Sequence, residues 1–356
     1  MNKKVTIQDI ADALGISRNT VSKAINNSEG LADATREKIL QKAVEMGYKQ
    51  FSYVNTLTGI SASPSGISAF PSEQKPAVPG FLGEIALLTS AFLSHSHFAS
   101  LMLDKFQREI SDLGYTMNTH RITERNLADI TLPATFQKEQ VKAIICIEMF
   151  DWDYDEMLCK LGIPILFVDG PAKKNGRSLP ADQLYMDNTT EISKFVNEML
   201  EHNLTRIGFI GNYTHCQSFF ERYTAFYLTM LMAGQKIEEQ FIINSNKRTE
   251  IESKIAALTE LPDVFICAND FIASDAMQAL AAVGKHVPDD VKLCGFDDSA
   301  ESRMSRPPMT TIHIHTQIMA FTAVHLLLSR IKHPFLDFRT VHTETDLIYR
   351  ESAKVD

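Results

Sequence analysis

The chain contains 356 residues, a length that predicts two or three domains and a sizeable hydrophobic core. Its 44% hydrophobic and 22% charged residues are ordinary for a globular protein, and no run approaches the roughly 18 apolar residues of a membrane helix. The N-terminus is polar, which argues against a secretory signal, and the five cysteines form no C-x-x-C pair. We therefore expect a cytoplasmic protein with no disulfide framework and no membrane partner.

The net charge of −9 is unevenly distributed along the chain. Residues 1–60 contain eight Lys and Arg against six Asp and Glu, a net +2, whereas the remaining 296 residues contain 27 against 38, a net −11. Only the first segment is suited to a polyanion, and its small charge implies weak non-specific attraction to DNA. Specific contacts would have to supply the affinity.

The first segment begins with signals for a short helix. Thr6 and Asp9 have the spacing of a capping box, with Asp in place of the usual Glu or Gln. They predict a helix over residues 7–14, and Gly15 can end that helix in the left-handed conformation.

Two further helices are predicted after this turn. Ser17 is placed to cap a helix over 18–25, and a third helix is expected over 34–46. A small residue, a turn glycine and a valine, spaced four and then six residues apart, are typical of a helix-turn-helix unit (Ala11, Gly15 and Val21).

The second helix carries side chains suited to reading DNA. In a helix-turn-helix unit this helix enters the major groove, where Arg and Lys match guanine and Asn matches adenine. The candidates for base edges are Arg18, Asn19, Ser22 and Lys23, and further DNA-binding candidates, mainly for phosphate, are Thr6, Ser17, Thr20 and Asn26. The alternative is a three-helix cap whose polar faces are merely solvated.

Residues 58–80 separate this helical segment from the rest of the chain. Twelve of these 23 residues are Ser, Pro or Gly, so we predict a linker without a core of its own. From residue 84 to about 352, short apolar runs alternate with amphipathic segments, which predicts parallel sheets covered by helices. The predicted strands are 84–89, 141–147, 163–168, 206–210, 264–268 and 291–295, and the predicted helices include 98–113, 190–203, 221–233 and 273–283.

Polar side chains follow several of the predicted strands, at the edge of a parallel sheet where ligands bind. Asp169, Asn269 and Asp297 occupy such positions, and Ser218 and Arg222 lie near the start of the helix after another strand. Asp and Asn accept hydrogen bonds from vicinal hydroxyls, and Arg offers a donor fork, so these residues predict a cleft for a small polyhydroxylated molecule. The alternative is that the Asp and Asn residues only cap helices or form turns.

The N-terminal segment resembles the DNA-binding headpiece of the LacI/GalR (lac-repressor) family. The similarity is nearly continuous from Val5 to Tyr48 and includes V-T-I-Q-D-I-A-D-A-L-G-I-S-R-N-T-V-S-K-A-I-N-N-S and A-T-R-E-K-I-L-Q-K-A-V-E-M-G-Y. The resemblance implies that Arg18, Asn19 and Lys23 read bases.

The resemblance also implies a short hinge helix that inserts a leucine into the minor groove, where an apolar wedge kinks DNA. Counting from Tyr48 places that leucine at Leu57, although the residue could instead be part of the linker. The family usually passes directly from hinge to first strand, so the Ser/Pro/Gly-rich stretch is a departure. We predict a headpiece at 1–48, a hinge at 49–57, a linker at 58–83 and a sensor at 84–356.

Four sensor segments are similar in order and spacing to the same family: F-I-C-A-N-D-F-I-A-S-D-A-M-Q-A-L, K-L-C-G-F-D-D-S, R-P-P-M-T-T-I and D-L-I-Y-R-E-S. They imply a sensor that resembles periplasmic sugar-binding proteins, with two α/β subdomains, three crossovers and a cleft between them. The residues implied to contact effector or line the cleft are Phe98, Asp169, Ser218, Arg222, Asn269, Phe271 and Asp297. The resemblance further implies a homodimer on a pseudo-palindromic operator.

Two histidine pairs and one aromatic stretch allow other interpretations. His313 and His315 form one H-x-H pattern, and His95 and His97 form another; paired imidazoles can bind a transition metal. No third and fourth ligands stand at metal-site spacing, which favours hydrogen-bonded histidines, so we expect no metal and no cofactor. Residues 150–154 interleave acids and aromatics that could stack on a sugar or pack on the surface.

No P-loop, nucleophile-elbow or H-E-x-x-H motif is present, so we do not expect an enzyme. The sequence predicts a ligand-responsive, sequence-specific DNA-binding regulator, most readily a repressor whose operator affinity is controlled by a carbohydrate-like effector. A metal- or nucleoside-responsive regulator on the same scaffold, and a solute-binding module without a DNA target, remain as alternatives.

Overall fold

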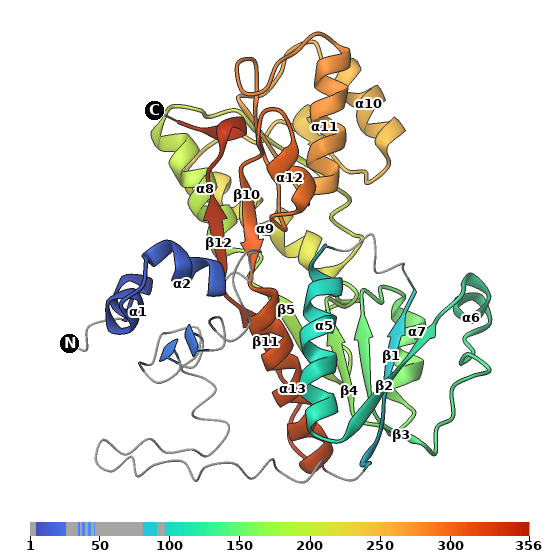
Figure 1. Cartoon of the computed structure of the whole chain (residues 1–356). Coiled ribbons are helices and arrows are strands. Elements are labelled where there is room, and N and C mark those ends of the chain that lie inside the picture. The colour runs from blue at the N-terminus through green and yellow to red at the C-terminus, as the bar shows by residue number, and fades with distance from the viewer. Residues whose placement is uncertain are drawn as a thin grey trace.

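The structure, a computed structural model, describes residues 5–25, 35, 38–39, 42–43, 46, 81–90 and 97–355. Figure 1 shows that residues 81–355 form two α/β subdomains, one above the other. Within the described residues, no helix is long and apolar enough to cross a membrane. The predicted hinge and all but the last three residues of the predicted linker lie outside the described residues.

Two short helices, α1 (Ile7–Leu14) and α2 (Arg18–Ile25), have the predicted bounds. The capping box also forms as predicted: the Asp9 amide donates to Thr6 Oγ1 at 3.3 Å, and the Thr6 amide donates to Asp9 Oδ2 at 2.8 Å. Gly15 ends α1 with a φ of 66°, a conformation that glycine adopts at little cost. Local chemistry is therefore sufficient to define the turn between the helices.

A small core joins α1 and α2 to the described part of the third helical segment. Residues 35, 38–39 and 42–43 are helical and lie within the helix predicted over 34–46. The fully buried side chains of this core are Ile10, Ala11, Val21, Ala24, Ile39 and Ala43. Because this core buries one side of α2, the opposite side is left to face solvent.

The N-terminal subdomain contains a six-stranded parallel sheet in the order β11-β5-β4-β3-β1-β2. Its strands are β1 (Gly83–Thr89), β2 (Tyr115–Arg121), β3 (Val141–Ile147), β4 (Ile165–Val168), β5 (Asp182–Met186) and β11 (Thr340–Thr343). Its helices are α5 (His97–Asp112), α6 (Glu124–Asp129), α7 (Trp152–Cys159) and α13 (Thr316–Lys332). Side chains of α5 and α13 pack on one face of the sheet and those of α7 on the other, so the central strands are buried on both sides.

The C-terminal subdomain contains a four-stranded parallel sheet in the order β7-β6-β8-β9. Its strands are β6 (Ile207–Ile210), β7 (Ile242–Ile243), β8 (Val264–Cys267) and β9 (Lys292–Cys294). Its helices are α8 (Thr190–Glu201), α9 (Gln217–Met232), α10 (Arg248–Ala256), α11 (Asp270–Ala282) and α12 (Ala300–Met304).

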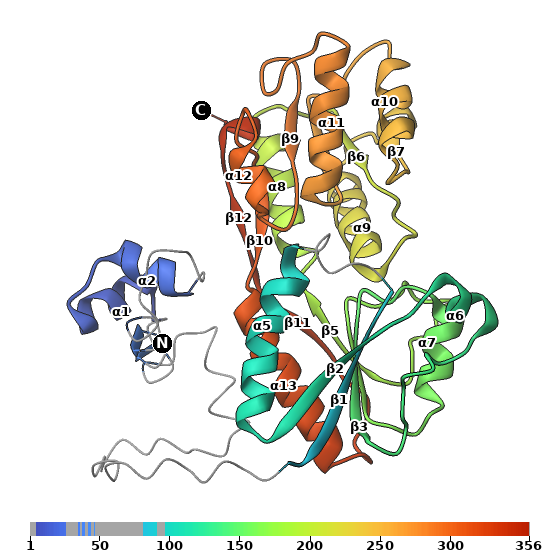
Figure 2. The ribbon, with the colours of Figure 1, turned by 45° about the vertical axis from the view of Figure 1, so that its right-hand side comes forward.

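The chain crosses between the subdomains three times. The crossings follow β5, join β10 (Thr311–Ile314) to α13, and join β11 to β12 (Thr345–Ile348). At the junction β10 and β12 pair antiparallel, and Figure 2 shows this pair running along the side of the upper subdomain. Because three chain crossings and the short β10–β12 sheet join the subdomains, the angle between the subdomains can change without unfolding the main sheet of either one.

Several element boundaries differ from the sequence prediction. β1 begins at Gly83, so the linker predicted over 58–83 extends one residue too far. α9 and α11 begin four and three residues earlier than predicted, at Gln217 and Asp270. Strands β2 and β5 were missed because polar residues interrupt their apolar pattern, as the sequences YTMNTHR and DQLYM show.

Asp155 is a buried carboxyl group in the core of the N-terminal subdomain. It lies on α7 with no exposed surface, and among the described residues neither carboxyl oxygen has a hydrogen-bond partner. Burial, together with the Coulombic effect of Asp151, raises the pKa of Asp155 to about 8. The folded protein therefore holds this group protonated at neutral pH, whereas the unfolded chain ionises it.

Asp155→Asn is expected to stabilise the protein above neutral pH. Because the folded pKa is raised, the contribution of Asp155 to stability is complete below the unfolded pKa and is lost as pH rises towards about 8. The loss approaches about 1.4 kcal/mol per pH unit. Urea unfolding at pH 5 and pH 8 should show a smaller decrease in midpoint for Asp155→Asn than for wild type. Asp153→Asn, on the same helix but with an exposed side chain, should behave like wild type.

Candidate functional site

The candidate base-reading residues lie on the exposed side of α2. Arg18, Asn19 and Lys23 are exposed, Ser22 is half-buried, and Val21 is buried in the small core. The structure therefore places these polar side chains together on one helix surface beside a tight turn. An exposed helix of this kind fits the major groove and presents its side chains to base edges.

The candidate phosphate contacts are hydroxyls that also stabilise the helix starts. Ser17 Oγ accepts from the Thr20 amide at 3.0 Å, and the two hydroxyl oxygens lie 2.7 Å apart. Thr6 takes part in the capping box of α1. A hydroxyl has two acceptor lone pairs and one donor, so a hydroxyl that caps a helix can still take part in a hydrogen bond with a phosphate. Asn26 and Leu57, also predicted to contact DNA, lie outside the described residues.

Asp169 and Ser218 connect the two subdomains. Asp169 follows β4 in the N-terminal subdomain, and Ser218 lies in the first turn of α9 in the C-terminal subdomain. Both are buried, and the Ser218 hydroxyl donates to Asp169 Oδ1 at 2.6 Å. Burial raises the pKa of Asp169 to about 6, although the Ser218 hydrogen bond and the charge of Arg222 oppose the shift. The carboxyl group is therefore close to titration at neutral pH.

Arg222, one turn further along α9, is only 2% exposed and makes several contacts. Its Nε donates to Asn188 Oδ1 at 2.9 Å, and its Nη1 donates to the Ala268 carbonyl oxygen at 2.6 Å. The guanidinium carbon lies 3.4 Å from the centroid of the Phe296 ring, and Nη1 lies 3.9 Å from Asp297 Oδ1. Arg222 thus joins α9 to the ends of β8 and β9 and to the first crossover.

Asp297 lies beyond the end of β9, as predicted, and its side chain is 12% exposed. Burial raises the pKa of Asp297 well above its usual range. Arg222 opposes this shift, while the nearby acids Asp270, Glu148 and Asp169 add to it. Several carboxyl groups and one guanidinium therefore lie near one another where the strands of both subdomains end.

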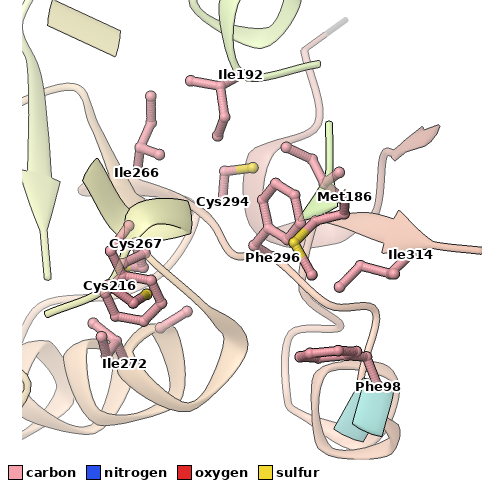
Figure 3. Close-up of a cluster of buried hydrophobic side chains, with 14 of the residues drawn as sticks. Phe98, Met186, Ile192, Cys216, Ile266, Cys267, Ile272, Cys294, Phe296 and Ile314 are labelled. Carbon is pink, nitrogen blue, oxygen red and sulfur yellow. The ribbon is translucent and has the colours of Figure 1, made fainter. Parts of the chain in front are cut away.

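Asn269, Phe271 and Phe98 were also predicted to contact effector. Asn269 Oδ1 accepts from the Ile272 amide at 3.0 Å, so the capping alternative describes its position in this structure. Phe271 is 36% exposed at the start of α11. Phe98, on α5, is buried in the same hydrophobic cluster as Phe296, and Figure 3 shows both rings on the side of the cluster that also contains Ile314.

Two family models match different parts of the chain. The model for bacterial regulatory proteins of the lacI family matches residues 6–50, and the model for the periplasmic binding protein-like domain matches residues 196–353. The chain belongs to the LacI family. The lacI match contains α1, α2 and the exposed base-reading candidates, and the second match contains most of the C-terminal subdomain.

Curated relatives of LacI-family type match the chain from end to end. The repressor PurR of Mannheimia succiniciproducens is 24% identical, with 98% of each chain covered. The regulator CelR of Thermobifida fusca is 25% identical with 99% of each chain covered, and GalR of Lacticaseibacillus casei is 27% identical with 98% of this chain and 99% of GalR covered. As a LacI-family member the chain is a DNA-binding transcriptional regulator with a ligand-binding sensor, which confirms the sequence prediction.

Solved structures of the family share the fold. The CelR–cellobiose complex has a TM-score of 0.65 and 21% identity, covering 98% of this chain and all of that one. The lac repressor dimer bound to operator and the anti-inducer ONPF has a TM-score of 0.62 and 19% identity, covering 98% and 99%. These relatives are regulators, in keeping with the lack of a catalytic motif in the sequence.

Asn188 and Glu221 were missed by the sequence analysis of this LacI-family chain. Asn188 Nδ2 donates to Glu221 Oε2 at 2.8 Å and to Ser218 Oγ at 3.2 Å, and Glu221 Oε2 lies 3.6 Å from His342 Nε2 on β11. Burial would raise the pKa of Glu221, but hydrogen bonds from His342, Gln217 and Asn188 lower it. No sequence signal marks Asn188, because β5, the strand before it, is itself polar.

The histidines of the C-terminal H-x-H pattern each face a carboxylate. His313 Nδ1 lies 2.9 Å from Asp298 Oδ2, and His315 Nε2 lies 3.2 Å from Asp346 Oδ2. Among the described residues no group of three or more potential ligands could hold a metal ion. Hydrogen-bonded histidines, the interpretation that the sequence favoured, therefore describe this pair; His95, in the second pattern, lies outside the described residues.

The aromatic stretch at 150–154 fits neither of the two interpretations that the sequence left open, stacking on a sugar or packing on the surface. Asp151 caps α7 by accepting from the Tyr154 amide at 2.9 Å, and Trp152 and Tyr154 are buried in the core. These two side chains are therefore unavailable to stack on a sugar. Phe150 packs edge-on against His215, with ring centroids 4.8 Å apart.

Asn19→Ala and Lys23→Ala are each expected to weaken binding to the specific operator by about 1–3 kcal/mol, roughly 5- to 150-fold. Both side chains are exposed on α2, so the loss would come from base contacts rather than from folding. Fluorescence anisotropy at fixed salt, with a duplex selected from random sequences and a scrambled duplex, measures the effect. Lys160→Ala, on the sensor, is the control. Equal weakening on both duplexes would contradict the base-reading assignment.

Proposed function

We propose that this LacI-family regulator is a cytoplasmic repressor without catalytic activity. It would bind a pseudo-palindromic operator as a homodimer, in the manner of the lac repressor dimer bound to operator. The headpiece (1–48), hinge (49–57), linker (58–83) and sensor (84–356) follow from the sequence pattern. Arg18, Asn19 and Lys23 would read bases, and Leu57 would act as the minor-groove wedge.

One observation carries the proposal for the sensor. Asp169, Asp297 and the α9 pair Ser218 and Arg222 come from three separate segments of the sequence but meet near the ends of strands from both subdomains. Carboxyl, hydroxyl and guanidinium groups that converge in this way can bind several hydroxyl groups of one small molecule. We propose that they bind a carbohydrate-like effector, with Phe98, Asn269 and Phe271 at the edge of the site.

The charges around Arg222 favour an effector without a phosphate group. The charge of Arg222 acts to lower the pKa values of Asp169 and Asp297. The carboxyl groups of Glu148 and Asp169 act to raise the pKa of Asp297. A phosphorylated sugar would add negative charge to a group already rich in carboxyl groups. A neutral sugar adds none and offers hydroxyl donors to the carboxylates.

The mechanism would use two angles between the subdomains. In this structure the start of α9 is held to the N-terminal subdomain by Ser218 on Asp169 and by the Gln217 amide, which donates to the Gly170 carbonyl oxygen at 3.3 Å. Effector hydroxyls that bind Asp169 would compete with Ser218 and shift the angle between the subdomains. Because effector and operator would each prefer one angle, each changes the affinity of the other by the same factor.

A thermal-shift screen of the full chain tests this function. The panel contains mono- and disaccharides, sugar phosphates, nucleosides and divalent metals. A ligand at about 100 times its Kd stabilises the folded state by about 2.7 kcal/mol, which shifts Tm measurably. A neutral sugar that stabilises wild type but not Asp297→Asn, and that changes operator affinity, supports the proposal. A response to metals alone, reversed by a chelator, would replace it with a metal-responsive regulator.

A further inference from the structure

A polar cavity lies on the N-terminal subdomain, away from the proposed effector site. It has a volume of about 400 Å³ and lies beside β2, the edge strand of the six-stranded sheet. That volume is within the roughly 300–1,000 Å³ of small-molecule sites. We call it the β1–β2 cavity. Its seven lining residues are all polar: Glu84, Asn118, Thr119, His120, Thr135, Gln137 and Gln140.

The β1–β2 cavity begins at the opposite end of the sheet from the cleft. Glu84 is the second residue of β1, and Figure 1 shows the start of β1 at the bottom of the lower subdomain. The proposed effector site lies instead beyond the carboxyl ends of strands, at Asp169 and Asp297. A molecule in the β1–β2 cavity would therefore be a second ligand and not an extension of the effector.

Strand pairing places three polar side chains on one face of the sheet. In the parallel pair of β1 and β2, Asn118 stands opposite Ala86 and His120 stands opposite Leu88. Glu84 lies two residues before Ala86, so the alternation of side chains along a strand puts it on the same face. The chain before β3 supplies three more of the lining residues. The cavity is therefore a product of the sheet register and of the segment that leads into β3.

Glu84 is a buried carboxylate held by hydrogen bonds within this cavity. It is 8% exposed, its Oε2 accepts from Asn118 Nδ2 at 2.7 Å, and its Oε1 lies 3.2 Å from His120 Nε2. An ionised carboxylate only accepts, so Nε2 donates to it. In the neutral imidazole Nδ1 then accepts from the Thr135 hydroxyl, 3.2 Å away. Among the described residues, neither a lysine nor an arginine forms an ion pair with Glu84.

These contacts leave the cavity suited to a cation that also carries hydroxyl groups. A carboxylate offers about four acceptor positions, and Asn118 and His120 occupy two of those on Glu84. A buried carboxylate with no lysine or arginine beside it is stabilised by an added positive charge. The amides and hydroxyls of the wall both donate and accept, and an alkyl chain placed against them would leave them without partners.

We propose that the β1–β2 cavity binds a small hydroxylated primary amine, of which an amino sugar is the simplest example. The ammonium group donates to Glu84, and the hydroxyl groups bind the amides and hydroxyls of the wall. Glu84 directly follows the linker predicted at 58–83, so the ligand binds where the chain enters the sensor. The proposal does not depend on the identity of the effector in the cleft.

Isothermal titration of the full chain with glucosamine tests the proposal. Glucose, which has a hydroxyl in place of the ammonium group, and putrescine, which has no hydroxyl, are the comparison ligands. Each titration is repeated with Asp297→Asn, which alters the proposed effector site and leaves the cavity unchanged. In that variant glucosamine should bind at least about 10-fold more tightly than glucose or putrescine, because only glucosamine satisfies both Glu84 and the wall.

Two variants of the cavity should each weaken glucosamine binding at least about 10-fold. Glu84→Gln removes the charge and keeps the size of the side chain. Gln137→Lys adds a positive charge at an exposed lining residue without touching the buried hydrogen bonds. Gln278→Lys makes the same change at an exposed position on α11 and should bind glucosamine like wild type. Unaltered Tm values would show that the variants fold.

Three results would overturn the proposal. The first is no binding of glucosamine to the wild-type chain. The second is binding that Asp297→Asn abolishes but both cavity variants retain, which would place glucosamine in the cleft. The third is glucose binding to Asp297→Asn as tightly as glucosamine, which would show that the ammonium group makes no contact with Glu84.

Discussion

Asp182→Ala is expected to lower the free energy of unfolding by about 3–5 kcal/mol, because it removes the acidic partner that two arginines share in a buried network. Asp182, the first residue of β5, has no exposed surface. Arg330 on α13 donates to both of its carboxylate oxygens, at 2.9 and 3.0 Å, and Arg339 Nη2 donates to Oδ2 at 3.1 Å. Without the carboxylate, Arg330 keeps a buried charge with no acid beside it.

Acid should weaken the same network in the wild-type protein. Burial alone would raise the pKa of Asp182, but hydrogen bonds from Arg330 and Arg339 outweigh it and lower the pKa below the usual value. For a carboxyl group with a lowered folded pKa, the stabilisation is present above the unfolded pKa of about 3.9 and is lost as pH falls through the folded value.

Urea unfolding at pH 7 measures the effect of Asp182→Ala. The matched control is Asp129→Ala, which removes an acid from an exposed pair with Arg125 whose side chains are 56% and 88% exposed. An exposed pair of this kind contributes about 0–1 kcal/mol, so this control should unfold close to wild type. Equal midpoints for the two variants would show that the buried network does not hold α13 against the sheet.

Arg222→Lys is expected to weaken effector binding about 100-fold or more while leaving operator affinity within about twofold. Lysine keeps the positive charge near Asp297 but loses the planar fork that contacts Asn188, Ala268 and the Phe296 ring together. In the proposed site the guanidinium fork would donate two charge-assisted hydrogen bonds to the effector. Losing both, at about 1.5–3 kcal/mol each, would exceed the 2.7 kcal/mol that corresponds to 100-fold. Isothermal titration with the effector found in the screen gives the change in Kd.

The control for this variant is Arg206→Lys in the same subdomain. Arg206 pairs on the surface with Glu238 and Glu260, and its side chain is 34% exposed. It should change neither effector binding nor operator binding. If Arg222→Lys lost operator binding and Tm along with effector binding, Arg222 would have a structural role and the proposed site would need another donor.

Where the chemistry is local, the sequence predicted the structure closely. The Thr6–Asp9 capping box, the turn at Gly15 and the bounds of α1 and α2 depend on residues within a few positions of one another. The β3 strand is apolar and buried except at Lys142, and its predicted bounds are also confirmed. Such signals need no knowledge of what the element packs against.

Where the burial or the hydrogen bonds of a residue depend on packing between distant segments, the prediction from the sequence was incomplete. Residues 150–154 suggested a loop, but Trp152 and Tyr154 are buried because α7 covers one face of the sheet. Asn269 fits both a capping role and a ligand role, and only its hydrogen bond to the Ile272 amide shows which it performs in this structure. Asn188 was missed because its partners, Ser218, Glu221 and Arg222, lie on a helix of the other subdomain.

The sequence by itself determined the family, the helix-turn-helix headpiece, the alternating α/β pattern and most of the residues proposed for the effector site. Only the tertiary structure decided how those residues interact, with Ser218 on Asp169 and Arg222 between Asn188 and Phe296, and only it brought His120 to Glu84. The physical reason is the separation along the sequence over which each kind of interaction acts. Caps, turns and amphipathic periods act over a few residues, whereas contacts across 30 to 50 residues depend on the packing of whole subdomains.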